Sequence, residues 1–192
     1  MDWRICVRAV QRGIVIAALS SAVEMMLDAG TAAAASYVVP QGYVDVANEH
    51  GIPPRILYAV AMQESALLLP SGIVRPWPWT LNVEGRAERF RGREEAHQAL
   101  TWYLRSGVRS IDIGLMQVNW RWHGDRLRDP WTALDPYFNL RVGATILAEH
   151  YRSTGDWQKA IGLYHASANT PAAKHRAENY RADVNRHLGR MQ

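Results

Sequence analysis

Apolar residues recur at helical spacing through most of the second half of this chain of 192 residues. Four segments show the pattern, and each has the i, i+3, i+4 spacing that places apolar side chains on one face of a helix. They are residues 93–106, 139–151, 157–166 and 171–188. We therefore expect a mainly helical domain.

Two shorter helices are expected before these four. Tyr43, Val44, Val46 and Ala47 recur at helical spacing, and Gly51 follows as a stop. A second helix is expected to open at residues 53–54, because proline is tolerated in the first helical turn. Its apolar face is expected to contain Ile56, Leu57, Val60 and Ala61.

A segment without helical character separates the two groups of helices. Prolines at positions 76 and 78 exclude a helix there, and residues 79–83, Trp-Thr-Leu-Asn-Val, are typical of a short strand. Glu84 and Gly85 then form a turn, with Glu84 and Glu88 expected in solvent. The sequence predicts one small β-element around residues 77–90.

Composition limits the partners of the protein. With 48% hydrophobic and 21% charged residues, the chain is long enough for one domain of ordinary core size. A formal charge of +4 suits an anionic partner such as nucleic acid, a lipid surface or an acidic cell wall. No nucleic-acid motif accompanies the arginines, so no nucleic-acid partner is expected.

The first 35 residues have the pattern of a secretory signal peptide. Arginines at positions 4, 8 and 12 precede the apolar residues 13–23, and small residues follow at 32–36. Glu24 and Asp28 interrupt the apolar run before it reaches the length of a spanning helix, which argues against an uncleaved anchor. We expect cleavage near Ala35 or Ser36, export to the periplasm, and a mature domain of residues 36–192. Cys6, the only cysteine, lies within the signal.

One carboxylate has the setting of a proton donor. Glu64 follows Val60 by one helical turn, so it is expected to project from the buried side of its helix. An ordinary Glu has a pKa of about 4.3, and acting as an acid at neutral pH requires desolvation that raises this value. Apolar neighbours are available for that purpose at positions 62, 67, 68 and 116. A solvated Glu at a helix end is the simpler interpretation of the residue alone.

Four segments in order resemble one enzyme family. They are Glu64-Ser65, residues 114–117 (Gly-Leu-Met-Gln), residues 160–167 with Tyr164 and His165, and residues 180–184 with Tyr180. This series is similar to the Glu-Ser, Gly-Leu-Met-Gln, Ala-x-x-x-Tyr-Asn-x-Gly and Tyr-x-x-x-Val motifs of lytic transglycosylases, lysozyme-like enzymes that cleave peptidoglycan. The resemblance covers about residues 41–188. It implies a lysozyme-like fold of the goose-type or SLT class.

The resemblance also implies roles for individual residues. Glu64 would be the catalytic acid and then the base, and the hydroxyl of Tyr180 would reach its carboxyl group. Ser65 would hold that carboxyl group or contact substrate. Gly114 would let the backbone approach the sugar, while Met116 and Gln117 would give an apolar floor and an amide for sugar groups. Tyr164 matches a motif tyrosine, but His165 and Ser167 replace the usual Asn and Gly.

Two other functions stay open. Asp112 precedes Gly114 closely and could serve as the second carboxylate of a hydrolytic muramidase, although a short acid before a glycine turn more often bonds nearby backbone N–H groups. Asn119 could simply cap a turn. The other alternative is a non-catalytic subunit that binds the wall. Retention of Glu64, Ser65, Gln117 and Tyr180 together argues against it.

The tryptophans and histidines were also considered as residues that bind a ligand or a metal. Most tryptophans are expected in the core, above all Trp102 and Trp157, while others near the motif segments could stack on sugars: these are at positions 77, 79, 120, 122 and 131. The histidines lack zinc-site spacing, and no nucleotide motif occurs, so no metal and no cofactor are expected.

A narrower resemblance concerns the biological role. Residues 112–120 (Asp-Ile-Gly-Leu-Met-Gln-Val-Asn-Trp), Pro130-Trp131 and residues 139–147 look like the specialised lytic transglycosylases of conjugation and type IV secretion machines. The segment 76–83 adds to this likeness. It implies local opening of the wall for a transenvelope complex, with the glycan strands of peptidoglycan as substrate.

Overall fold

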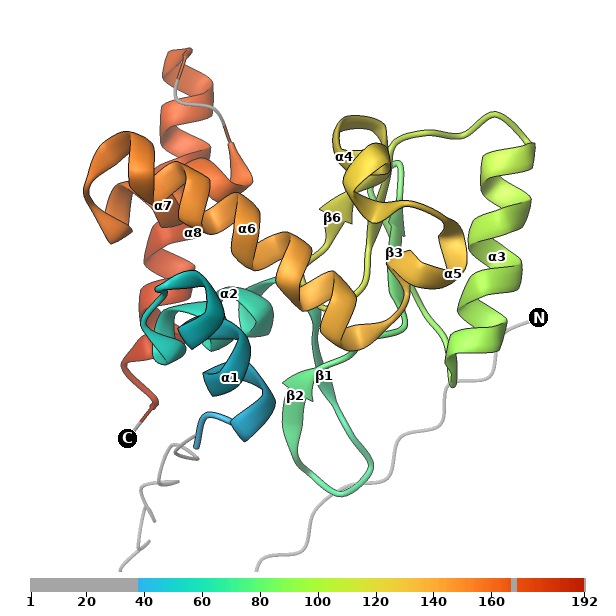
Figure 1. The fold of residues 1–192 in the computed structure, drawn as a ribbon, viewed down its shortest axis with the longest axis horizontal. Coiled ribbons are helices and arrows are strands. Elements are labelled where there is room, and N and C mark those ends of the chain that lie inside the picture. Colours follow the sequence, from blue (N-terminus) through green and yellow to red (C-terminus); the bar gives the residue numbers. More distant parts are fainter. Residues whose placement is uncertain (1–37, 167–168, 192) are drawn as a thin grey trace, which may run out of the picture. The chain divides into compact units, whose positions relative to one another are not determined.

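A computed structural model describes residues 38–166 and 169–191 of the chain (Figure 1). The predicted signal peptide, residues 1–35, and Ser167 lie outside the described residues. Within the described part, no helix combines the length and the apolar character needed to cross a membrane.

The two short helices predicted in the N-terminal part of the domain are present. Helix α1 spans Gln41–His50 and ends at Gly51, whose φ of 66° is the left-handed conformation that glycine adopts without a Cβ penalty. Helix α2 spans Pro54–Ser65 with proline in its first turn. Six successive residues of α2, from Leu57 to Met62, are buried. This helix therefore runs through the core and carries Glu64 to its last turn.

Three helices of the C-terminal half pack in series, and the last of them packs on α2. Helix α6 spans Pro136–Thr154, α7 spans Trp157–His165 and α8 spans Pro171–Leu188. Each begins after a side-chain cap, and these caps are Asp135, Asp156 and Thr170. Helix α7 packs on both α6 and α8, and α8 also packs on α2. The chain thus brings the end of α8 close to α2, far apart in sequence (Figure 1).

Helix α3, Arg93–Arg105, is also present as predicted. Two short helices beside it were not predicted. Helix α4 spans Trp120–Leu127 with a break at His123, and α5 spans Pro130–Ala133. Only Leu127 of α4 is buried, so this helix lacks the apolar periodicity by which the others are recognised.

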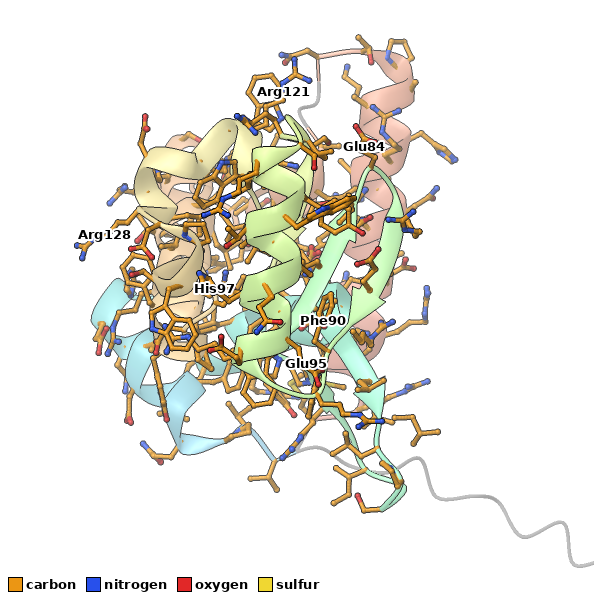
Figure 2. The ribbon with its side chains drawn as sticks, turned by 90° about the vertical axis from the view of Figure 1, so that its right-hand side faces the viewer. Glu84, Phe90, Glu95, His97, Arg121 and Arg128 are labelled. Atoms are coloured by element: carbon orange, nitrogen blue, oxygen red, sulfur yellow. The ribbon has the colours of Figure 1, made fainter. Side chains whose placement is uncertain are left out.

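The β-structure is larger than the predicted element. The predicted short strand is β3, Thr80–Val83, and it forms a hairpin with β4, Arg86–Arg89, which was not predicted as a strand. Glu84 is exposed at the turn of this hairpin (Figure 2). Two further strands, β5 (Ile111–Ile113) and β6 (Val118–Asn119), extend it to an antiparallel sheet in the order β4-β3-β5-β6. A separate hairpin joins β1, Ala66–Leu68, to β2, Val74–Pro76. Strands of two or three residues are too short to show alternation in the sequence.

One hydrophobic core joins the helices to the sheet. Its fully buried members include Leu57, Leu81, Leu100, Ile113, Leu147 and Ile161, which come from α2, β3, α3, β5, α6 and α7. Trp157 packs against this core and stacks on Tyr151 with ring centroids 4.0 Å apart. The prediction that Trp102 is a core residue is wrong, because its side chain is 63% exposed on α3. The mainly helical class with a small β-part is confirmed.

Candidate active site

A cleft of about 380 Å³ lies where α2, the four-stranded sheet, α4, α6 and α7 meet. Glu64 reaches it from the last turn of α2. The other residues of its wall are Asn82, Asp112, Gln117, Val118, Asn119, Trp122, His123, Ile146, Tyr164 and His165. The cleft therefore collects half of the predicted site residues, namely Glu64, Gln117, Tyr164 and His165, from segments far apart in the sequence.

The setting of Glu64 favours its neutral form. Burial raises the pKa of its carboxyl group, the negative charge of Asp112 adds to the rise, and a hydrogen bond from Tyr180 opposes it, leaving the pKa at about 8. The position at the carboxyl end of α2 acts in the same direction, because a negative charge is unfavourable there. Met62 and Met116 are buried as expected, whereas Leu68 is 66% exposed and cannot contribute. Glu64 is thus protonated at neutral pH.

The hydroxyl of Tyr180 donates a hydrogen bond of 2.5 Å to Oε1 of Glu64. The two residues are 116 positions apart, and their contact was predicted from the motif series. Tyr180 is only 5% exposed, and burial together with the nearby Glu64 raises its pKa well above the ordinary value. It therefore remains a hydrogen-bond donor at neutral pH.

Tyr164 and His165, at the end of α7, hold the surroundings of this pair. The hydroxyl of Tyr164 donates to the backbone oxygen of Met116 at 2.8 Å. The imidazole of His165 stacks on the ring of Tyr180, with centroids 4.7 Å apart and planes within 3°. Burial and the positive charge of Arg176 lower the pKa of His165, which favours the neutral ring at neutral pH. The histidine that replaces the usual Asn thus packs on the tyrosine that contacts Glu64.

The loop from Gly114 to Gln117 is fixed by Asn139, a residue that sequence analysis did not single out. Asn139 is 1% exposed on α6; its Oδ1 accepts from the backbone N–H of Met116, and its Nδ2 donates to Ile113 and Ala133 oxygens. A Cβ added to Gly114 would lie 2.6 Å from the Asn139 side chain, and Gly114 has φ of 80°. Glycine is required here by Asn139 and by backbone conformation. The predicted reason, close approach of a sugar, is not needed.

A polar row crosses the sheet along one wall of the cleft. Asn82, Asp112 and Asn119 are cross-strand neighbours on β3, β5 and β6, and all three line the cleft. Nδ2 of Asn119 donates to Oδ1 of Asp112 at 2.7 Å, and Oδ1 of Asn119 caps α4 as expected. Asp112 was expected to accept hydrogen bonds from nearby backbone N–H groups. Its carboxyl group instead accepts one from the side chain of Asn119. Burial also raises its pKa.

The match with known families agrees with this geometry. Residues 80–186, more than half of the chain, match the model of the Transglycosylase SLT domain. The chain belongs to the SLT transglycosylase family. Its fold is therefore lysozyme-like, and the family implies lytic transglycosylase activity on peptidoglycan. No curated protein and no solved structure matches the chain. The matched region of the SLT domain includes Tyr164 and Tyr180 but begins after Glu64, so the assignment of Glu64 rests on the cleft.

Ser65 has a different place from the one expected in an SLT domain. Its side chain is fully buried, and its hydroxyl donates to the backbone oxygen of Leu115 at 2.8 Å and approaches that of Ala61 at 3.3 Å. It neither contacts the carboxyl group of Glu64 through a hydrogen bond nor faces the cleft. Ser65 instead ties the end of α2 to the loop that contains Met116 and Gln117.

Gln117 lies in the cleft with its amide partly engaged. Its Nε2 donates to backbone oxygens of Thr80 and Gly114, at 3.2 and 2.9 Å. The backbone of Gln117 is left-handed, with φ of 45°, a conformation that costs energy for a residue with a side chain and that is found often at functional sites. Contact of this amide with sugar stays a prediction. Met116 is fully buried and does not line the cleft, so its predicted contact with sugar is not seen.

Of the five tryptophans considered for sugar stacking, only Trp122 lines the cleft, and it is 74% exposed. Trp77 and Trp79 pack edge to face in a separate pocket with Tyr43 and Tyr58. The indole of Trp131 lies under the guanidinium of Arg93, 4.2 Å from ring centroid to Cζ. Among the described residues, no group of three or more His, Cys, Asp or Glu side chains is placed to hold a metal ion.

Replacing Tyr180 by phenylalanine is expected to lower kcat by about ten to a hundredfold, because one hydrogen bond that orients the Glu64 carboxyl is lost. The same bond lowers the pKa of Glu64, so its loss should raise that pKa. The fall in activity at alkaline pH should then occur at a higher pH in the variant than in the wild type. Initial rates across pH test both effects. Tyr151→Phe on α6 is a matched control. Full activity with an unchanged pH profile would remove Tyr180 from the site.

Proposed function

We propose that the protein is a peptidoglycan lytic transglycosylase that cleaves the β-1,4 bond between N-acetylmuramic acid and N-acetylglucosamine and leaves 1,6-anhydromuramic ends. One observation carries the proposal. A carboxyl group that is neutral at neutral pH lines a cleft of about 380 Å³, and a buried tyrosine orients it. Membership of the SLT family supports the substrate class.

In the first step Glu64 acts as an acid. Its proton passes to the oxygen that bridges the two sugars, and the bond from that oxygen to C1 of the muramic acid breaks. The glucosamine leaves as an alcohol, and C1 becomes electron-deficient. The carboxylate that remains is stabilised by the hydrogen bond from Tyr180. The acetamido group of the muramic acid would stabilise C1, as the resemblance implies.

In the second step the Glu64 carboxylate acts as a base. It takes the proton of the 6-hydroxyl group, and O6 of the same muramic acid forms the new bond to C1. Glu64 is then protonated again, and no water is consumed. One carboxyl group with a pKa of about 8 can perform both transfers, because it gives up and recovers a proton near the working pH.

A hydrolytic muramidase is the second candidate, and the position of Asp112 favours it. Asp112 lines the same cleft as Glu64 and raises the pKa of its carboxyl group. A second carboxylate could stabilise C1 or activate a water molecule, as in most glycosidases. The rise in the pKa of Asp112 itself weakens that role at acidic pH, since more of the group is then neutral.

Product mass separates the two candidates. Purified peptidoglycan is digested with the wild-type protein, and the released muropeptides are analysed by mass spectrometry. Anhydromuramic ends, lighter by one water than reducing ends, are expected. Reducing ends from the wild-type protein would instead identify a muramidase. If the protein released no muropeptides at all, the wall-binding subunit would be favoured.

The pH dependence of cleavage should follow the raised pKa of Glu64. Because the acid must be protonated, kcat/KM is expected to be level below a pH of about 8 and to fall about tenfold per unit above it. Initial rates between about pH 5 and about pH 10 test this, with circular dichroism at each pH as a control for folding. An alkaline limb near the ordinary pKa of a carboxylate would contradict the assignment.

The biological setting is also proposed from the sequence. Export by the signal peptide would place the enzyme in the periplasm, where it could open the wall locally for a conjugation or secretion complex. The motif at residues 112–120 supports this role by its resemblance to such enzymes. Terminal sequencing of the exported protein should find a start near Ser36 or Tyr37. A chain that keeps residues 1–35 would point to an anchored enzyme.

A further inference from the structure

A second depression, about 330 Å³ in volume, adjoins the cleft. We call it the arginine pocket, because three of its seven lining residues are arginines. It is formed mainly by α4 and is lined by Arg109, Trp120, Arg121, Trp122, Gly124, Asp125 and Arg128. The lining contains three guanidinium groups and one carboxylate, that of Asp125, so the pocket is positively charged.

The charges of these arginines are not neutralised by carboxylates. Among the ion pairs of the described residues, none includes Arg109, Arg121 or Arg128. Arg109 donates through Nη1 to the backbone oxygens of residues 104 and 108, which leaves its charge in place. On the same helix Arg126 does pair with Glu149, at 2.9 Å. The pocket therefore offers cations to a ligand that brings its own negative charge.

Aromatic rings hold two of the guanidinium groups. Cζ of Arg121 lies 5.4 Å from the ring centroid of Trp122, and Cζ of Arg128 lies 5.1 Å from that of Phe138. Such contacts restrict a long side chain without removing its charge. Figure 2 shows Arg121 and Arg128 at the surface. Each keeps N–H donors for a carboxylate, which guanidinium binds with two parallel hydrogen bonds.

Trp122 connects the pocket to the cleft. It lines both, and 74% of its side chain is exposed. The two depressions differ in charge, because the cleft contains the neutral Glu64 and the carboxyl group of Asp112, whereas the pocket contains the three arginines. A ligand that spans Trp122 should thus be neutral on the cleft side and anionic on the α4 side.

We propose that the arginine pocket binds the carboxylates of the peptide stem carried by the glycan strand. This inference rests on the proposed function, which places the glycan in the cleft. The sugar backbone of peptidoglycan is largely uncharged, and the short peptide on the lactyl group of each muramic acid carries several carboxylates. With the sugars beside Glu64, a stem that passes Trp122 reaches Arg121 and Arg128. The enzyme would then prefer strands with peptides over bare strands.

Binding of matched glycans to a protein that cannot cleave them tests the proposal. In the Glu64→Gln background, Arg121→Gln and Arg128→Gln are combined, and Kd is measured by calorimetry for glycan tetrasaccharides with and without their peptide stems. The double substitution should raise Kd about ten to a hundredfold for the stem-bearing glycan and leave Kd for the bare glycan unchanged. The affinity difference between the two glycans should also shrink with added salt.

The bare glycan also distinguishes the source of the carboxylate. Enzymatic removal of the stem leaves a free lactyl carboxylate on the muramic acid, whereas an intact stem holds that carboxyl group in an amide bond. The double substitution in a pocket that binds the lactyl carboxylate would therefore weaken binding of the bare glycan and not of the stem-bearing one. That result, or equal affinity of all proteins for both glycans, would overturn the proposal. Arg190→Gln is the matched control, because this exposed arginine follows α8, remote from α4 (Figure 1).

These outcomes are separate from failure of the proposed function. Bond cleavage and product mass are measured on the wild-type protein, whereas the stem experiment measures binding by a variant without the acid. Reducing ends with stem-dependent binding would reject the transglycosylase mechanism and keep the pocket. Anhydromuramic ends together with binding that does not depend on the stem would support the transglycosylase mechanism and reject the proposed role of the pocket.

Discussion

Replacing Glu64 by glutamine is expected to abolish glycan cleavage, with kcat lower by about a thousandfold or more. The amide keeps the shape of the side chain and can still accept the hydrogen bond from Tyr180, but it cannot give up and recover a proton. Release of soluble muropeptides from purified peptidoglycan is the measurement. Sugar release at the wild-type rate would reject Glu64 as the acid.

The same variant should be more stable than the wild type at alkaline pH. The pKa of Glu64 is raised from 4.5 to about 8 in the folded protein, so the folded state binds the proton more tightly than the unfolded state. The free energy of unfolding therefore falls as pH rises from the ordinary pKa to the folded one. Glutamine has no such dependence. Thermal unfolding at about pH 9 compares the two proteins above that interval.

Asp112→Asn is the matched comparison for activity. It removes the other carboxylate of the cleft and keeps a side chain of the same size beside Asn119. A transglycosylase that relies on Glu64 should retain substantial activity in this variant. Equal loss in the two variants would make the two-carboxylate hydrolase the better interpretation.

The sequence was most informative where periodic burial and caps specify local structure. Helix α8 was predicted at residues 171–188 and occupies Pro171–Leu188, because Thr170 and Pro171 define its start and apolar residues recur along it. The contact of Tyr180 with Glu64 could also be predicted, but only from the motif order. Helical periodicity predicts that Tyr180 lies on the buried face of its helix, but it does not predict which helix packs against that face.

The parts that were missed depend on tertiary contacts. Ser65 was expected at the carboxyl group, yet its hydroxyl turns to Leu115, since a buried hydroxyl must find an acceptor and this backbone oxygen is within reach. Trp102 has the spacing of a core residue, but no element covers that part of α3. The arginine pocket was not foreseen, because α4 shows no apolar periodicity and Arg109 joins it from a distant segment.

Asn139 shows most clearly what the sequence could not reveal. The sequence analysis placed it at the start of the predicted helix 139–151 and assigned it no role. In the structure its side chain is buried and makes three hydrogen bonds to the backbone of residues 113, 116 and 133. These bonds join α6 to the loop that contains Gln117 and to the end of α5. The shape of one cleft wall thus depends on one amide.

Asn139→Ala is expected to lower the free energy of unfolding by about 2 to 5 kcal/mol, since it leaves buried backbone groups without partners and opens a cavity. For a domain of this size the melting temperature should fall by about 5 to 15 °C. Activity of the folded fraction should fall too, because the N–H of Met116 loses its acceptor and the adjoining Gln117 is no longer held in its left-handed conformation. Asn179→Ala is the control, because this exposed residue bonds only to His175. Calorimetry that finds the two variants equally stable would show that Asn139 does not anchor the loop.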